Sequence, residues 1–244
     1  MRAAVLFSGG KDSCLALYYA MGSADVKCLI TMLPENPASY MFHTPNIILA
    51  GKQAEAIGLP IIMRRTEGEK EAELADLKGA IKEGIELYGI DCVFTGAISS
   101  TYQASRIGRV CAELRIECVN PLWGRDPIGL LEEALGRGFH AIVTGVFAMG
   151  LEDFIGRRID EKFIREMMRL WEIYGINPAG EGGEFETFVL DAPFFRRGLI
   201  VERSHIQRDG SGGLVLILDE VRVTDKPANH GSNGIGALAR LRGP

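Results

Sequence analysis

The chain has 244 residues, of which 47% are hydrophobic and 24% are charged, a composition typical of a globular protein with one large or two small domains. It contains no run of about eighteen apolar residues, so we expect no membrane-spanning helix and a cytoplasmic location. The net charge is −5, whereas most proteins that bind phosphate backbones carry a surplus of basic residues. This difference disfavours a nucleic-acid partner.

The first predicted element is a short strand that leads into a glycine-containing turn. An apolar run at 3–7 precedes the segment Ser8-Gly9-Gly10-Lys11-Asp12-Ser13, and a helical pattern follows it. Paired glycines allow a positive φ and let a ligand approach the backbone closely. The N-terminus of the helix attracts anions, and two hydroxyls and a lysine add further donors. The turn therefore predicts a polyphosphate site, in which Asp12 holds a Mg²⁺ ion against the phosphates.

Strands and helices alternate along the next hundred residues. The expected strands lie at 26–33, 61–63, 91–96 and 117–120, and the expected helices lie at 46–58, 70–88 and 100–114. Such alternation is typical of an α/β fold whose parallel sheet is covered on both faces. We expect a doubly wound, mainly parallel five-stranded sheet. A ligand should bind beyond the carboxyl ends of the strands, where the turns at Ser8 and Gly96 lie.

A proline-flanked segment at 121–127 interrupts this pattern, and we place a domain boundary within it. The first domain covers 1–124, and a smaller α+β domain covers 125–244. The elements expected in the second domain are helices at 129–137 and 160–174 and strands at 141–144, 186–190, 199–205 and 214–223, with a hairpin turn at 209–213. From about residue 226 the chain is rich in glycine and asparagine, so we expect a flexible tail.

Two groups of side chains are expected to belong to the core. The helix at 160–174 carries large side chains at helical spacing, namely Phe163, Met167, Leu170, Trp171 and Tyr174. The five cysteines form no Cys-x-x-Cys pair, and each lies in an apolar or helical setting. We therefore expect buried free thiols at Cys14, Cys28, Cys92, Cys111 and Cys118.

A second candidate site is the acidic segment Glu181-Gly182-Gly183-Glu184-Phe185-Glu186. On a strand, Glu184 and Glu186 would share one face, because alternate residues point the same way. Clustered carboxylates repel one another unless a cation or a cationic ligand stabilises them, so the segment predicts such a ligand. The alternative is a solvated acidic turn.

Tyr102, Gln103 and Arg106 form a third candidate group at helical spacing, just after the turn at Gly96. These side chains would contact a nucleotide or a substrate, with Arg106 on a phosphate. The alternative interpretation, an exposed helix face with a packed tyrosine, stays open.

The turn at 8–13 resembles the S-G-G-x-D-S loop of the N-type ATP pyrophosphatase superfamily. The segment at 177–187, together with Gly96-Ala97-Ile98, Tyr102-Gln103, Arg106 and Pro121-Leu122-Trp123, narrows the resemblance to the diphthine–ammonia ligase (diphthamide synthase) family. The resemblance implies an adenine nucleotide alpha hydrolase-like fold that uses ATP and Mg²⁺. It also implies amidation of diphthine on translation elongation factor two with ammonium, through an acyl-adenylate, with release of AMP and pyrophosphate.

The resemblance also implies roles for individual residues. It implies catalytic roles for Lys11, Asp12, Glu184 and Glu186, and it implies that Asp12 holds the metal. The residues expected to bind the nucleotide are Ser8, Gly9, Gly10, Lys11, Asp12, Ser13, Thr31, Met32, Leu33 and Gly96. Those expected to bind the diphthine side chain, which carries a quaternary trimethylammonium group, are Tyr102, Gln103, Arg106, Glu181, Gly182, Gly183, Glu184 and Glu186.

Two other functions stay open. An adenylating enzyme acting on a tRNA base, like the thiolases of the superfamily, would usually show paired cysteines and a basic surface. The lack of a Cys-x-x-Cys pair and the net charge of −5 count against it. A non-catalytic ATP sensor would need no acidic glycine-rich segment.

Nothing in the sequence resembles an ammonia-generating domain, so free ammonium is the simpler nitrogen source. The oligomeric state stays open, and a homodimer is one alternative.

Overall fold

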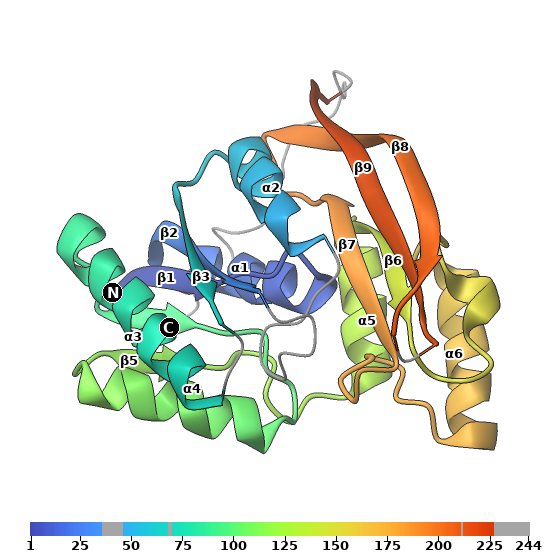
Figure 1. Cartoon of the computed structure of the whole chain (residues 1–244), viewed down its shortest axis with the longest axis horizontal. Coiled ribbons are helices and arrows are strands. Elements are labelled where there is room, and N and C mark those ends of the chain that lie inside the picture. Colours follow the sequence, from blue (N-terminus) through green and yellow to red (C-terminus); the bar gives the residue numbers. More distant parts are fainter. Residues whose placement is uncertain (36–45, 68–69, 211, 227–244) are drawn as a thin grey trace.

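The computed structural model describes residues 1–35, 46–67, 70–210 and 212–226, and the tail predicted from about residue 226 lies almost wholly outside them. The described chain contains one sheet of five strands and one of four, each covered by helices (Figure 1). None of its helices is long and apolar enough to cross a membrane.

The five-stranded sheet is parallel throughout and has the order β3-β2-β1-β4-β5, which confirms the predicted doubly wound α/β class. Its strands are β1 (Arg2–Leu6), β2 (Asp25–Pro34), β3 (Ile61–Thr66), β4 (Cys92–Phe94) and β5 (Glu117–Val119). The chain adds strands on one side of β1 and then crosses to the other side at β4. The strand order therefore reverses between β1 and β4, where ligands usually bind in open parallel sheets.

Alternating side chains of the buried strands supply two separate cores. Ala3 and Val5 of β1 pack into a large core, whereas Ala4 packs into a second core beneath α3 and α4. The helices of this half are α1 (Lys11–Ser23), α2 (Ala50–Ile57), α3 (Lys70–Tyr88) and α4 (Thr101–Glu113). These cores fix the carboxyl ends of β1 and β4 side by side, which is the geometry that a site at the point of reversal requires.

The helix expected at 46–58 begins later than predicted. Asn46 has a left-handed backbone with φ of 66°, and a 3-10 turn at Ile47–Leu49 precedes α2. The side-chain amide of Asn46 donates to the carbonyl of Leu216 at 2.9 Å and its oxygen accepts from the N–H of Leu218 at 2.8 Å. Asparagine tolerates this conformation, and the two hydrogen bonds stabilise it against continuation of the helix.

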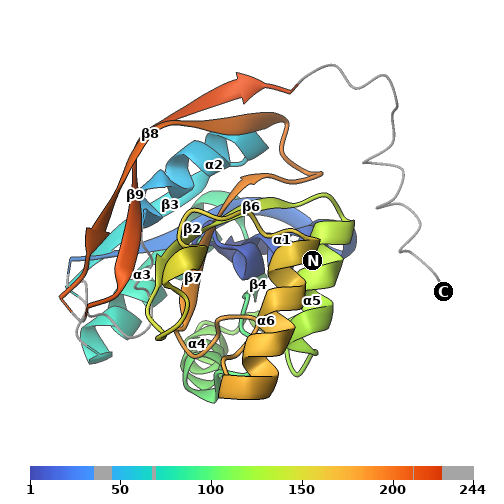
Figure 2. The ribbon, with the colours of Figure 1, turned by 90° about the vertical axis from the view of Figure 1, so that its right-hand side faces the viewer.

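The second half of the described chain, which follows β5, contains an antiparallel sheet with the order β7-β6-β9-β8. Its elements are α5 (Pro127–Gly136), β6 (His140–Val146), a 3-10 turn η2 (Glu152–Phe154), α6 (Glu161–Tyr174), β7 (Phe185–Asp191), β8 (Arg197–Arg208) and β9 (Leu214–Asp225). The predicted hairpin joins β8 to β9. Asp126 and Asp160 cap the starts of α5 and α6 by accepting N–H groups of the first turn. Figure 2 shows α5 and α6 running side by side.

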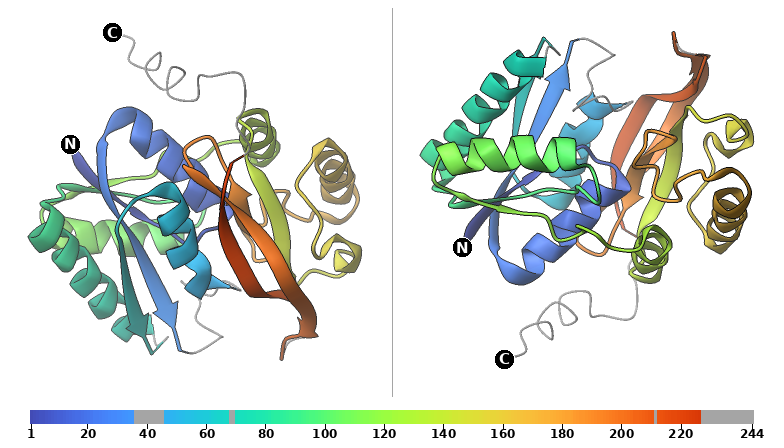
Figure 3. Two further views of the ribbon diagram at one scale, coloured as in Figure 1. Left: turned by 90° about the horizontal axis from the view of Figure 1, so that it is seen from above. Right: turned by 90° about the horizontal axis from the view of Figure 1, so that it is seen from below.

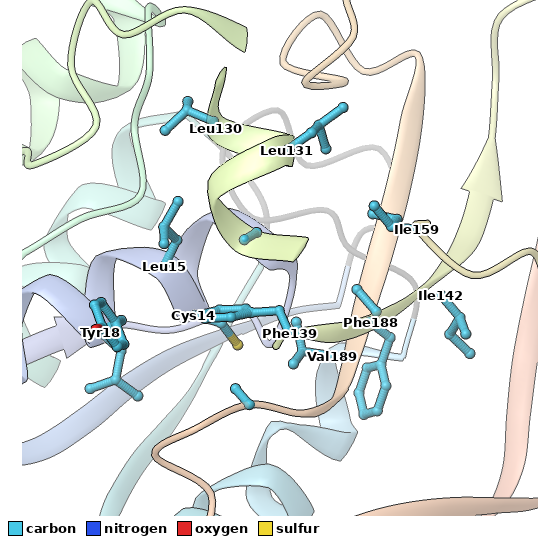
Figure 4. Close-up of a cluster of buried hydrophobic side chains, with 14 of the residues drawn as sticks. Cys14, Leu15, Tyr18, Leu130, Leu131, Phe139, Ile142, Ile159, Phe188 and Val189 are labelled. Carbon is cyan, nitrogen blue, oxygen red and sulfur yellow. The ribbon is translucent and has the colours of Figure 1, made fainter. Parts of the chain in front are cut away.

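The two halves share one hydrophobic core. Leu15 and Tyr18 of α1, Leu131 of α5 and Val189 of β7 belong to the same cluster of buried side chains (Figure 4). The four-stranded sheet lies between α2 and α6 (Figure 3). The division into domains 1–124 and 125–244 therefore stays a prediction, because the buried core is continuous across it.

The predicted core groups are confirmed in part. All five cysteines are free thiols, and Cys118 alone among them is half-buried. On α6, Phe163 and Met167 are buried, but Trp171 is 43% exposed and Tyr174 is 71% exposed, so the prediction that the whole stripe is core is wrong. The last turns of α6 extend past the beginning of β7 (Figure 1).

Candidate active site

The turn after β1 adopts the sharp conformation that its glycines predict. Gly9 has a φ of +82°, and a Cβ placed on it would lie 1.9 Å from Oε1 of Gln53. Gln53 is fully buried on α2, and its side-chain amide donates to the carbonyls of Gly9 at 2.9 Å and Val189 at 2.8 Å. Glycine is required here for both its conformation and its lack of a side chain. Gln53 was missed in the sequence, where it looks like an ordinary helix residue.

Hydrogen bonds within the turn, and one to β7, fix the conformation of the turn. The hydroxyl of Ser13 accepts the N–H groups of Ser8 at 3.2 Å and Gly9 at 3.1 Å, and it lies 3.1 Å from the carbonyl of Gly10. The N–H of Lys11 donates to Oγ1 of Thr187 in β7 at 3.0 Å. Asp12 and Ser13 follow in the first turn of α1, where backbone N–H groups have no intrahelical acceptor. These two N–H groups are the donors that an anion would meet.

Lys11 lies at the centre of the site and is 6% exposed. Its ammonium group donates to Oδ2 of Asp12 at 2.8 Å and to the carbonyl of Ala179, and it lies 5.4 Å from the centre of the Phe185 ring. The pKa of the Asp12 carboxyl is raised overall, mainly by burial. The charge of Lys11 opposes this increase, and the nearby Glu181 adds to it. The lysine thus links the turn to the glycine-rich acidic segment.

Gly96, at the end of β4, contacts the backbone of the turn directly. A Cβ on Gly96 would lie 2.9 Å from both the carbonyl carbon of Asp12 and the nitrogen of Ser13. Real Cβ atoms do not approach backbone this closely, so any side chain here would displace the start of α1. Gly96 also lines the cavity, and its expected contact with a nucleotide stays a prediction.

The acidic segment separates into three different environments. Oε1 of Glu181 accepts the N–H groups of Ile98, Ser99 and Ser100 at 3.0, 2.6 and 2.8 Å, at the start of α4. Glu184 precedes β7 rather than lying within it, and its Oε1 accepts the N–H of Asn177 at 3.2 Å. Glu184 therefore stabilises the loop and is absent from the residues that line the cavity, so the catalytic and substrate-binding roles expected of it stay predictions.

Glu186 is the acidic residue of β7 that faces the cavity. Burial raises its pKa to about 8, although Lys11 lowers it, and the charge of Asp12 adds to the increase. Such a carboxyl group gains most from a cation, because a positive charge would restore its ionised form.

One cavity of about 810 Å³ joins these groups. Its wall combines the turn after β1, the ends of β2 and β4, the start of α4, the glycine-rich acidic segment and β7. Among the sequence-predicted residues, those that line it are Ser8, Gly10, Lys11, Asp12, Ser13, Met32, Gly96, Gln103, Glu181, Gly182, Gly183 and Glu186. The structure thus brings together segments that lie up to 178 positions apart in the sequence, from Ser8 to Glu186.

The remaining predicted residues do not line this cavity. Thr31 is buried and donates its hydroxyl to the carbonyl of Phe7, and Leu33 lies further along β2. The guanidinium of Arg106 lies 4.0 Å from the centre of the Tyr102 ring, so these two side chains stack on one another. Gly9 contacts Gln53 instead of the open space. Lining residues that the sequence did not indicate include Thr187, Phe147 and Asp209.

The donor set suits a magnesium ion bound together with phosphates. Within the described ranges, no three His, Cys, Asp or Glu residues are placed to hold a metal ion by themselves. Asp12 offers one carboxylate beside the anion-binding turn. Mg²⁺ in nucleotide sites typically takes one or two carboxylates, water and phosphate oxygens, and Asp12 fits that pattern.

Comparison with known families gives two matches along the chain. The model of the diphthamide synthase N-terminal domain matches residues 1–118, and the model of the diphthamide synthase C-terminal domain matches residues 126–223.

Individual relatives agree with these matches. A diphthine–ammonia ligase of Danio rerio is 36% identical over 222 residues, covering 83% of this chain and 87% of the relative. The diphthine–ammonia ligase of Homo sapiens is 33% identical over 232 residues, covering 84% and 85%. A solved structure named as a predicted subunit of tRNA methyltransferase from Methanocaldococcus jannaschii has a TM-score of 0.41 and 20% identity, covering 79% of this chain and 97% of that chain.

Proposed function

The chain belongs to the diphthamide synthase family, and from that premise we propose that it is an ATP-dependent diphthine–ammonia ligase. Its substrate would be the diphthine side chain of translation elongation factor two, its nitrogen donor ammonium, and its products diphthamide, AMP and pyrophosphate. The observation that carries the proposal is that one cavity is lined both by the turn at 8–13 and by Glu186. A polyphosphate and a cationic side chain would each meet complementary groups in this cavity.

The turn after β1 supplies the groups that a triphosphate needs. The N–H groups of Asp12 and Ser13, which have no intrahelical acceptor, and the positive end of the α1 dipole would attract the phosphates to this turn. Lys11 would leave the carbonyl of Ala179 and bind the phosphates, so that its charge offsets the charge that develops on leaving pyrophosphate. Asp12 would hold Mg²⁺ against the phosphate oxygens, and the bound ion would neutralise charge in the transition state.

The adenine ring fits the apolar part of the wall. Leu6, Ile30 and Met32 line the cavity at the ends of β1 and β2, and Ile107 of α4, which belongs to the same core cluster, lines it as well. Apolar side chains favour the flat faces of a purine, whereas the exposed edge would meet backbone groups of β2, as expected from the sequence at 31–33.

The chemical steps require little covalent participation by the protein. The diphthine carboxylate attacks the α-phosphorus of ATP, and the bond to the β-phosphate oxygen breaks as pyrophosphate leaves. Ammonia then attacks the acyl carbon, AMP leaves with the bonding electron pair of the acyl–oxygen bond, and the extra proton of the new amide goes to solvent. Positioning and electrostatic stabilisation account for the catalysis, with Glu186 near the cationic substrate and Lys11 on the leaving group.

Turnover of the full chain tests this proposal. The purified protein is incubated with ATP, Mg²⁺, ammonium and diphthine-bearing elongation factor two, and AMP, ADP and pyrophosphate are measured together with the mass of the factor. AMP and pyrophosphate formed in equal amounts, only when the factor is present, would support the ligase. A Lys11→Met variant should lose the activity, and Lys27→Ala, which changes a lysine paired with Asp25 at the surface, should retain it. Formation of ADP, or AMP formation without the factor, would contradict it.

A further inference from the structure

The two carboxylate oxygens of Glu181 lie in different surroundings. Oε1 accepts the backbone N–H groups of Ile98, Ser99 and Ser100 at 3.0, 2.6 and 2.8 Å. Oε2 is buried, and among the residues that the structure describes it has no hydrogen-bond partner. Three donors at Oε1 fix the carboxylate in one orientation, so Oε2 is held in place without an interaction of its own.

A buried carboxylate oxygen without a partner needs an explanation, because burial of an unpaired polar group costs free energy. Common explanations are a catalytic role, or a water molecule or an ion that binds there. Oε2 of Glu184 is also buried and has no hydrogen-bond partner within the described ranges, but Glu184 does not line the cavity. Glu181 does line it, so a ligand in the cavity can reach this side chain.

Glu181 and Asp12 carry their negative charges close to one another. The pKa of Asp12 is raised mainly by burial, and the charge of Glu181 adds to the increase. The ammonium group of Lys11, 2.8 Å from Oδ2 of Asp12, offsets part of this negative charge. Once Lys11 moves onto the phosphates, as proposed above, the two carboxylates need another cation.

This arrangement matches the way in which Mg²⁺ binds beside nucleotides. Such an ion takes oxygen ligands, usually one or two carboxylates together with water and phosphate oxygens. Asp12 begins α1 and Glu181 belongs to the glycine-rich acidic segment, and both line the cavity that contains the turn at 8–13. Resting on the Mg²⁺–ATP site proposed above, we propose that Oε2 of Glu181 is a second carboxylate ligand of the magnesium ion, together with Asp12.

Glu181→Gln tests this role while it preserves the contact with α4. The glutamine oxygen can still accept the N–H groups of 98–100, but an amide nitrogen replaces Oε2, and this donor group cannot bind a cation. The full chain is mixed with Mn²⁺ and an ATP analogue in which a methylene group joins the α and β phosphates, and EPR measures the free Mn²⁺. We expect the Kd for Mn²⁺ to rise by about tenfold or more, at least the loss seen when a residue that only supports a metal ligand is changed.

Two controls separate metal binding from general damage. Glu184→Gln makes the same replacement at the other buried carboxylate oxygen, outside the cavity, and should leave the Kd for Mn²⁺ unaltered. Calorimetry with the analogue in EDTA measures nucleotide binding without metal, and its Kd should not rise in Glu181→Gln.

Unchanged Mn²⁺ affinity in Glu181→Gln would overturn the proposal, and a higher KM for the diphthine-bearing factor would then assign Glu181 to the cationic substrate. An equal loss of Mn²⁺ affinity in both variants, or an equal loss of analogue affinity with and without metal, would also overturn it, because either result indicates a structural effect. The metal measurements need neither the factor nor turnover. If the wild-type protein forms no diphthamide, the ligase function is refuted, and Mn²⁺ binding still decides the role of Glu181.

Discussion

The side-chain amide of Gln53 donates a hydrogen bond to the carbonyl of Gly9 at 2.9 Å and thereby attaches α2 to the turn that we assign to phosphate binding. The same nitrogen donates to the carbonyl of Val189 at 2.8 Å, and the N–H of Val189 donates to Gly9 at 3.0 Å. The turn is therefore held from the second half of the chain as well as from the first.

We expect Gln53→Leu to weaken both folding and nucleotide binding. Leucine has a similar size but leaves the buried carbonyls of Gly9 and Val189 without one partner each, so the free energy of unfolding should fall by about 2–3 kcal/mol. Chemical denaturation measures the stability, and calorimetry with Mg²⁺–ATP should show a higher Kd. A variant with wild-type stability and affinity would show that the amide contributes nothing to the shape of the turn.

Gly96→Ala should damage the site, because the new Cβ would lie 2.9 Å from the backbone of Asp12 and Ser13. The start of α1 must shift, so we expect the affinity for ATP to fall by about tenfold or more, equivalent to about 1.4 kcal/mol.

Gly108→Ala is the matched control for this change. Gly108 lies inside α4, with no atom within 4 Å of its Cβ position, so alanine should stabilise the protein by about 0.5–1 kcal/mol and leave ATP binding unaltered. Calorimetry and thermal unfolding distinguish the two variants, and equal ATP affinity in both would contradict the packing argument.

The titration of Glu186 should make stability depend on pH. Burial raises the pKa of Glu186 from 4.5 to about 8, so between these values the folded protein keeps a proton that the unfolded chain has lost. Stability from this group is complete below the unfolded pKa and is lost as the pH rises through the folded pKa. Relative to Glu186→Gln, the wild-type protein should thus become less stable as the pH is raised from about 5 to about 9. Parallel unfolding curves for the two proteins, with the exposed change Glu161→Gln as a reference, would contradict this expectation.

The two neighbouring glutamates should differ in their effect on the protein substrate. Glu186→Gln removes the carboxylate on the cavity wall, and we expect the KM for the diphthine-bearing factor to rise by about tenfold. Glu184→Gln keeps an oxygen that can accept the N–H of Asn177, so its effect should be much smaller. Steady-state kinetics at saturating ATP measures both, and a larger effect at Glu184 would restore the role that its sequence motif suggested.

Local patterns predict the fold and the conformation of the turn at 8–13 well, for physical reasons. An apolar run, two glycines and a helix start are adjacent in the sequence, so the strand, the turn and the dipole at 8–13 follow without knowledge of the rest of the chain. Gln53, Thr187 and Phe147 were not predictable in this way. Each looks like an ordinary residue of its own element, and its role arises only when distant segments meet.

The acidic segment shows how a small uncertainty in strand limits changes a site. Glu184 lies only one residue before β7 begins at Phe185, and its side chain accepts the N–H of Asn177 instead of lining the cavity with Glu186. Glu181 illustrates a different limit. Its partners, the N–H groups of 98–100, lie about eighty positions away, so this contact could not be predicted from the acidic motif, and the expected ligand contact of Glu181, which lines the cavity, stays a prediction.

A structure of the full chain with Mg²⁺ and a non-cleavable ATP analogue, in which a methylene group joins the α and β phosphates, tests the central claim most directly. The account predicts that the phosphates contact the N–H groups of Asp12 and Ser13, with Lys11 moved from Ala179 onto them and the α-phosphorus facing the wall of Glu186. A nucleotide bound elsewhere, or one whose α-phosphorus is shielded from that wall, would contradict it.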